Sequence, residues 1–280
     1  RRAPPKAAGI LPTDQYTKPT TAKLFRGTPE EEKLYERGQT LEQKSIYVVA
    51  AGGPGSRLLE PDTIPEQAKD IYEKVAAEGR ASKPTFPGRR VSGRSAFVNM
   101  LEHIQKSDPE GLVIVVVSEV TDQQVKNDLE RYGQNLDLPN LMIIEGQMYP
   151  SMDAEDGTLV TTYDEELDMR RVHFSPGGTF ETAKALTSQF TMPNGEKTDP
   201  ITYAENEGYE GALFLYADDA AVDARLIDSI KGTTVGEVDF AVSGLHKTGP
   251  MDPYGGTLAK RIRQDQETLV ITEMVMRELE

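Results

Sequence analysis

SIYVVAAGGPGSRL, residues 45–58, joins an apolar run directly to a glycine-rich turn. The run SIYVVA is short and rich in β-branched residues, which predicts a buried strand. Gly52, Gly53 and Gly55 follow it, and such a turn at the end of a strand lets backbone amides approach an anion. The pattern is neither the spaced dinucleotide fingerprint nor a P-loop, which ends in GK[ST]. A phosphate-binding turn and an ordinary strand-to-helix turn are therefore both open at this point.

Downstream of this stretch, strands and helices alternate as far as residue 231, which predicts an α/β fold with a doubly wound, mostly parallel sheet of the Rossmann-like kind. Apolar runs after residue 237 have no helix between them and predict antiparallel strands at the C-terminal end. The expected helices are 64–79, 95–106, 121–133, 179–190 and 221–232, and the expected strands are 45–50, 112–119, 140–146, 211–219, 238–245, 255–262 and 268–276.

Residues 1–43 differ in composition from the rest, mixing Pro, Lys, Thr and Glu without a period. They predict an extended N-terminal arm with a short helix around TPEEEKLYERG, which Thr28 can cap. We expect a protein partner to contact this arm. Residues 44–280 predict one α/β domain. The basic start of the chain is typical of the border of an organelle-targeting segment as well as of an ordinary flexible terminus, so cytoplasm and plastid stroma are the expected locations.

The composition of the 280-residue chain excludes several functions. Its 46 acidic and 31 basic residues give a formal net charge of −15, which disfavours general binding to nucleic acid. The chain has no cysteine, so thiolate chemistry is excluded, and its three histidines are too scattered for a metal cluster. No apolar run approaches the roughly 20 residues that cross a bilayer, so no membrane span is expected.

Polar residues follow the expected strands at the edge where an α/β sheet binds ligands. Ser56 adds a hydroxyl donor and Arg57 a planar cation to the glycine turn. Lys83 lies in SKPTFPG, where Pro84 and Pro87 stiffen the backbone and can hold the lysine toward the same edge. A surface lysine is the alternative for Lys83.

Acidic and amide residues complete this set. Asp218 and Asp219 close an apolar strand, so a carboxylate facing the crevice can bind Mg²⁺, whereas one of the pair can instead cap the next helix. Gln147 can offer a donor and an acceptor to a nucleobase edge, or be an ordinary polar loop residue.

Together these stretches resemble the UDP-glucose pyrophosphorylase family, in the form of its UDP-sugar and UDP-N-acetylhexosamine members. The resemblance covers about residues 40–280 in consistent order. The stretches that carry it are AGGPGSRL (51–58), SKPTFPGRRVSGRSAFVNMLEHI (82–104), VVVSEVTDQQV (115–125), GQMYP (146–150), SPGGTFETAKAL (175–186), LFLYADD (213–219) and KTGPMDPYGGTL (247–258).

The resemblance implies a uridylyltransferase that converts UTP and a sugar 1-phosphate to a UDP-sugar and pyrophosphate, with Mg²⁺ as cofactor. It implies three sets of site residues, which are Arg57, Lys83 and Lys247 for catalysis, Gly52, Gly53, Gly55, Ser56, Gln147, Gly177 and Gly178 for nucleotide binding, and Asp219 with Asp218 for the metal.

Departures from the family pattern favour a second hypothesis. Gly178 and Thr179 replace a histidine and a glycine of the family, the spacer after Lys247 is one residue longer, and the separation between the glycine loop and Lys83 is greater. The family's C-terminal sugar-binding part has no counterpart in the sequence. The alternative is a non-catalytic pseudoenzyme that serves as a structural or interaction subunit of a larger, plastid-type assembly.

Overall fold

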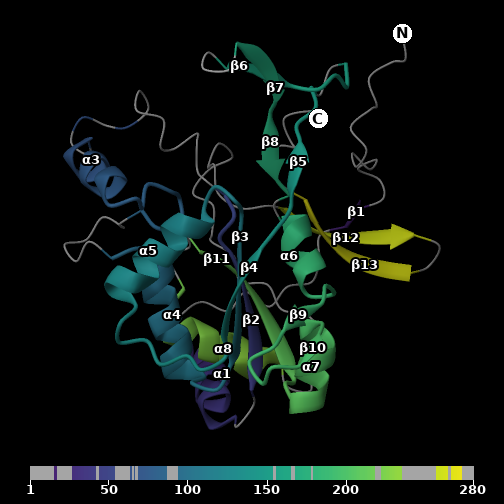
Figure 1. Cartoon of the computed structure of the whole chain (residues 1–280). Helices are drawn as coiled ribbons and strands as arrows, with labels where there is room; N and C mark the ends of the chain where they lie inside the picture. The colour runs from purple at the N-terminus through teal and green to yellow at the C-terminus, as the bar shows by residue number, and fades with distance from the viewer. Residues whose placement is uncertain are drawn as a thin grey trace.

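A four-stranded parallel sheet forms the centre of the computed structural model of the chain (Figure 1). Its strands are β11 (Gly211–Tyr216), β2 (Ser45–Ala50), β3 (Leu112–Val117) and β4 (Leu141–Glu145), in that order. The structure describes residues 16–17, 27–41, 44–53, 64, 66, 69–86, 94–153, 156–164, 168–177, 179–217, 222–234, 257–263 and 266–272.

Helices cover both faces of this sheet because its inner strands are apolar on both sides. Val49 and Val115 belong to a cluster that packs against α4 (Ala96–Ser107), α5 (Asp122–Tyr132) and α8 (Ala224–Thr234). Val48 and Ile114 belong to a second cluster, on the other face, with α6 (Thr179–Ala185) and α7 (Pro200–Glu207). A parallel sheet buried on both faces is the doubly wound architecture, so the predicted fold class is confirmed.

Local capping chemistry accounts for the start of α4 but not for that of α5. Ser95 caps α4, since its Oγ accepts from the N–H of Val98 at 3.0 Å. Thr121 precedes α5 but makes no side-chain cap bond, because its hydroxyl accepts instead from the N–H of Ser118 at 3.0 Å. In α3 (Lys69–Ala77), Val75 is buried, whereas Ile71, one turn earlier, is 48% exposed.

Several short pairs of antiparallel strands were not predicted from the sequence. β5 (Met148–Pro150) pairs with β8 (Phe174–Pro176), and β6 (Thr161–Asp164) pairs with β7 (Met169–Val172). Together these two strand pairs form a β-extension that projects from the carboxyl edge of the central sheet (Figure 1). β9 (Phe190–Thr191) and β10 (Lys197–Thr198) form a further pair before α7. Strands of two to four residues are too short for a period-2 pattern to emerge.

Helix α1 (Pro29–Thr40) lies within residues 1–43, the expected N-terminal arm, and packs along α8. Thr28 caps it as predicted, accepting from the N–H of Glu31 at 3.3 Å. The two helices touch at a glycine on each: a Cβ added to Gly38 would lie 1.8 Å from the carbonyl oxygen of Asp228, and one added to Gly232 would lie 1.9 Å from that of Leu34. Only glycine lets the backbones approach this closely. The domain boundary at residue 43 stays a prediction.

Antiparallel strands are present toward the C-terminal end, as expected. β12 (Thr257–Arg263) pairs with β13 (Gln266–Thr272) on one side and with β1 (Tyr16–Thr17) on the other. The expected strand over 238–245 lies outside the described residues.

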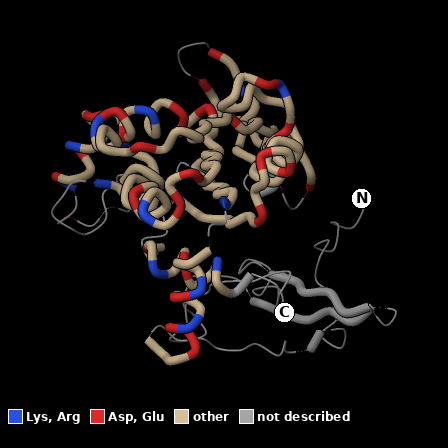
Figure 2. Tube along the Cα trace, turned by 90° about the horizontal axis from the view of Figure 1, so that it is seen from below, with Lys and Arg blue, Asp and Glu red and all other residues tan. Residues whose placement is uncertain are grey.

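Acidic and basic residues are interspersed along the described helices and hairpins (Figure 2). None of the described helices is both long and apolar enough to span a bilayer.

Candidate functional site

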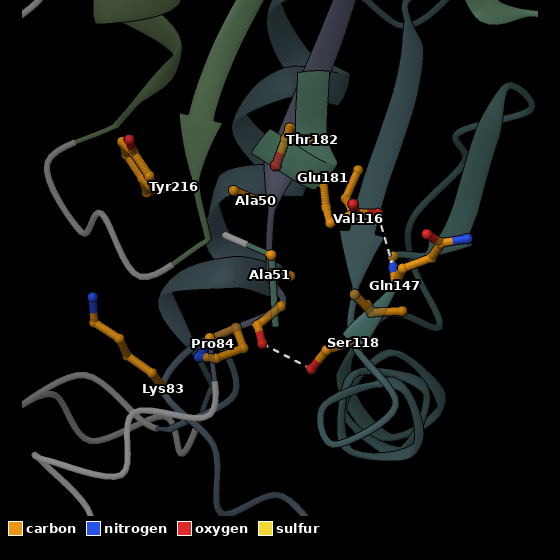
Figure 3. A pocket seen from close by; sticks show the side chains of 15 residues that line it. Ala50, Ala51, Lys83, Pro84, Val116, Ser118, Gln147, Glu181, Thr182 and Tyr216 are labelled. Atoms are coloured by element: carbon orange, nitrogen blue, oxygen red, sulfur yellow. Dashed lines mark hydrogen bonds between the residues drawn. The ribbon is translucent and has the colours of Figure 1, made fainter. Parts of the chain in front are cut away.

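A cavity of about 220 Å³ opens at the carboxyl ends of the central strands. Residues at the ends of β2, β3, β4 and β11 line it, together with the turn around Lys83 and the start of α6 (Figure 3). This is the edge at which open α/β sheets bind ligands.

Five of the predicted site residues line this one cavity, although they come from four separate segments: Gly52, Gly53, Lys83, Gln147 and Gly177. In the view of Figure 3, Lys83 and Gln147 lie on opposite sides of it, and the Gln147 side chain points away from its centre. The other predicted residues lie outside the described part of the chain, namely Gly55, Ser56, Arg57, Gly178, Asp218, Asp219 and Lys247.

The glycine turn after β2 is held from the neighbouring strand end. The hydroxyl of Ser118, which follows β3, donates to the carbonyl oxygen of Gly52 at 2.8 Å. A Cβ added at Gly52 would make only an ordinary 3.5 Å contact with the N of Ser118, and one added at Gly53 would meet no described atom within 4 Å. Packing of the described residues therefore does not require glycine at position 53.

The Lys83 turn is anchored through residues beside it. The Thr85 hydroxyl donates to the carbonyl oxygen of Arg80, and the N–H of Phe86 donates to that of Ser82 at 2.8 Å. Arg80 is buried, its Nε donates to Asp128 of α5 at 2.8 Å, and its guanidinium lies 4.6 Å from the centre of the Tyr132 ring. The turn is thus tied to the helix layer below the cavity.

Asp128 joins this turn to α4 as well, because its second carboxylate oxygen accepts from the Ser95 hydroxyl. Burial raises the pKa of Asp128, against the opposing effects of the Ser95 hydrogen bond and the Arg80 charge. One buried carboxylate therefore positions both the Lys83 turn and the capped start of α4.

Glu181, in the first turn of α6, forms the opposite wall. The N–H of Gln147 donates to its Oε2 at 2.8 Å and the Tyr149 hydroxyl donates to its Oε1. Lys184 Nζ donates to Gln147 Oε1 at 2.6 Å and lies 3.7 Å from Glu181 Oε1. Burial would raise the pKa of Glu181, but the hydrogen bonds from Tyr149 and Gln147 and the nearby Lys184 outweigh it, so the pKa lies below its usual value. The side chain is a carboxylate at neutral pH.

Gly177 fits against this wall without a side chain. A Cβ added there would lie 2.4 Å from Glu181 Cγ and 2.7 Å from a ring carbon of Tyr149. Glycine is therefore required at position 177 by the packing of the wall itself.

Sequence reasoning missed Glu181, Ser118 and Tyr216 among the residues that line the cavity. Ser118 follows the buried strand β3 and Tyr216 ends β11, and a position at the carboxyl end of a sheet strand is the signal that could have found them. Glu181 looked like an ordinary first-turn helix acid, a position that the helix dipole favours anyway.

A metal site fits poorly to the described residues alone. Glu181 is the only carboxylate among those that line the cavity, and its oxygens already accept hydrogen bonds from Gln147 and Tyr149. Within the described part, three or more metal-ligating side chains do not gather at any point. A Mg²⁺ site thus depends on Asp218 and Asp219, both outside the described residues.

Comparison with solved structures gives a match to the uridine diphosphate N-acetylglucosamine pyrophosphorylase from Trypanosoma brucei in complex with an inhibitor, with a TM-score of 0.60 and 16% sequence identity. The two proteins share a fold. The match covers 86% of this chain and 44% of that protein, so the chain spans less than half of its length. No protein-family model matches the sequence, and comparison with curated proteins gave no significant match.

Proposed function

We propose that the protein is a uridylyltransferase, which joins UTP and a sugar 1-phosphate to give a UDP-sugar and pyrophosphate. The observation that supports this proposal is the meeting of Gly52, Gly53, Lys83, Gln147 and Gly177 at one cavity. Those positions were selected as nucleotide and phosphate contacts from the sequence, and the fold around them is shared with a UDP-sugar pyrophosphorylase.

In the proposed reaction, an oxygen of the sugar phosphate attacks the α-phosphorus of UTP in line with the departing group. A new P–O bond forms as the bond to the β-phosphate breaks, and pyrophosphate leaves with the electron pair. The chain's part is positioning and charge stabilisation, because no covalent intermediate is needed.

Each proposed residue has a place in this scheme. The amides of the glycine turn and Arg57 hold the departing phosphates, while Lys83 and Lys247 stabilise the negative charge that develops on the transferred group. The backbone segment at Gln147 and the Gly177–Gly178 turn hold the base. Asp219, with Asp218, would hold Mg²⁺, which neutralises phosphate charge when bound.

Isothermal titration of the whole chain with UTP and Mg²⁺, followed by a pyrophosphate-release assay with a panel of sugar 1-phosphates, tests the proposal. We expect UTP binding and turnover with at least one sugar phosphate. Absence of UTP binding at millimolar concentration would refute a nucleotide site. UTP binding without turnover for any sugar would refute the transferase and favour the non-catalytic subunit.

A further inference from the structure

The side chain of Glu181 is a buried acid in the cavity wall, only 8% exposed. It lines the cavity between Val116 and Gln147 (Figure 3). A hydrogen bond formed with a carboxylate in such a shielded place is stronger than one formed in water. A ligand that reaches this wall is therefore favoured if it presents a hydrogen-bond donor to the Glu181 carboxylate.

The hydrogen bonds of Glu181 leave an acceptor position. Each carboxylate oxygen can accept about two hydrogen bonds. Within the described part of the chain, Oε2 accepts from the N–H of Gln147 at 2.8 Å, and Oε1 takes the Tyr149 hydroxyl and faces Lys184 at 3.7 Å. Oε2 thus retains capacity for one more donor, while Gln147 and Tyr149 keep the carboxylate from turning away.

We propose that Glu181 selects the nucleobase of the substrate by accepting a hydrogen bond from the ring N3–H of uracil. The inference rests on the proposed function and names the group that decides its base specificity. Uracil is an imide, and its N3 carries a proton. Cytosine has a bare nitrogen at N3, whose lone pair would face the carboxylate, and adenine presents a bare N1 in the corresponding place.

The expected preference follows from the cost of an unmatched buried acceptor. A hydrogen bond to a charged partner corresponds to about tenfold to a hundredfold in affinity. We therefore expect the wild-type chain to bind UTP at least about tenfold more tightly than CTP, with the difference originating at one atom of the ring.

The test is Glu181→Gln, with the dissociation constants of UTP and CTP measured for each protein. Glutamine has nearly the same shape, and the N–H of Gln147 keeps its amide oxygen at the Oε2 position, so the acceptor remains but loses its negative charge. We expect UTP affinity to fall about tenfold, because a neutral acceptor binds N3–H more weakly, and CTP affinity to hold or rise, so that the ratio of the two falls toward one. Glu145→Gln, at the exposed end of β4 and outside the cavity lining, is the matched control and should keep the wild-type ratio.

A purely architectural role for Glu181 predicts another result. If the carboxylate only holds the Gln147 loop, the substitution weakens UTP and CTP by the same factor and the ratio stays, which would overturn the inference. Should the variant fail to fold, wild-type protein with 3-methyl-UTP decides, since the methyl group removes the N3 proton. Binding as tight as that of UTP would overturn the inference, and a drop to the level of CTP would support it.

Failure of this inference is separable from failure of the proposed function. Wild-type protein that binds neither UTP nor CTP refutes both. Wild-type protein that binds them equally keeps the nucleotide site and removes Glu181 as its selector.

Discussion

Arg80 Nε lies 2.8 Å from Asp128 Oδ1, and both side chains are buried. Their sequence positions are 48 residues apart, so the contact connects the segment before the Lys83 turn to helix α5. Glu78 also pairs with Arg80, at 2.6 Å, and Ser95 binds the other oxygen of Asp128. The placement of Lys83 at the cavity therefore depends on a buried ionic network and not on the turn alone.

Asp128→Asn should be strongly destabilising, because it removes one of the two carboxylates that pair with the buried Arg80 guanidinium. We expect a loss of about 3–5 kcal/mol in the free energy of unfolding, measured by urea titration. The matched control is Asp122→Asn, which breaks the more exposed pair of Asp122 and Lys126 on the same helix. That change should cost at most about 1 kcal/mol. Equal losses of unfolding free energy in the two variants would mean that the buried ionic network stabilises the protein no more than the exposed pair does.

Lys83→Ala should lower turnover at least about a hundredfold if the ammonium stabilises charge in the transition state. Lys126→Ala is the control, since Lys126 lies on the exposed side of α5, outside the cavity lining. It should retain the wild-type rate. Turnover like that of the wild type in the Lys83 variant would remove this residue from the mechanism.

Gly53→Ala should weaken UTP binding without destabilising the protein, whereas Gly177→Ala should destabilise it. At position 53 a methyl group meets no described atom, so stability should hold while UTP binding weakens about tenfold, because the backbone can no longer approach the phosphates. At position 177 the methyl group would overlap Glu181 and Tyr149, so unfolding free energy should fall by about 1–3 kcal/mol. Thermal melting and UTP titration of both variants separate the two effects. Unchanged UTP affinity in the first variant would exclude Gly53 as a phosphate contact.

Acid should loosen the packing of α1 on α8 through Glu31. Hydrogen bonds from Arg225 chiefly, then Ser229 and Gly27, with the Arg225 charge, lower the pKa of Glu31 from 4.5 to about 2 despite its burial. Because the folded-state pKa is the lower one, the stabilisation is complete above about pH 4.5 and is lost as the pH falls toward about 2.

Glu31→Gln isolates this contribution. The variant should be less stable than the wild type at pH 7, and the gap should narrow as the pH falls below about 4.5, as measured by urea titration at several pH values. A gap that stays constant down to pH 2 would show that the Glu31 carboxylate does not contribute to the acid sensitivity.

Much of the architecture was predictable because its signals are local. β2 and β3 are continuous apolar runs, α4 carries its own cap at Ser95, and the glycine turn follows directly on its strand. Since the ends of parallel strands meet at one edge, the convergence of Gly53, Lys83 and Gln147 could also be anticipated.

What escaped prediction depends on partners distant in the sequence. Nothing in the residues around Arg80 indicates burial, because Asp128 lies in another helix. Glu181 gains its place in the wall only when β5 and β8 pair and bring Tyr149 and Gly177 against it. Ile71 lies one turn before the buried Val75 in α3 and is nevertheless 48% exposed, since a helical period identifies a face but not whether anything packs on it.

The contact of α1 with α8 has a consequence for how the chain withstands cleavage. It holds the first and last of the described helices together, so the polypeptide between them is in effect a closed loop. A protease that cuts between β6 and β7 would release no fragment, because β2 on one side of the cut remains paired with β11 on the other along six residue pairs. Such a nicked protein would run as two bands in denaturing gels and as a single species in solution, its cavity still formed from both pieces.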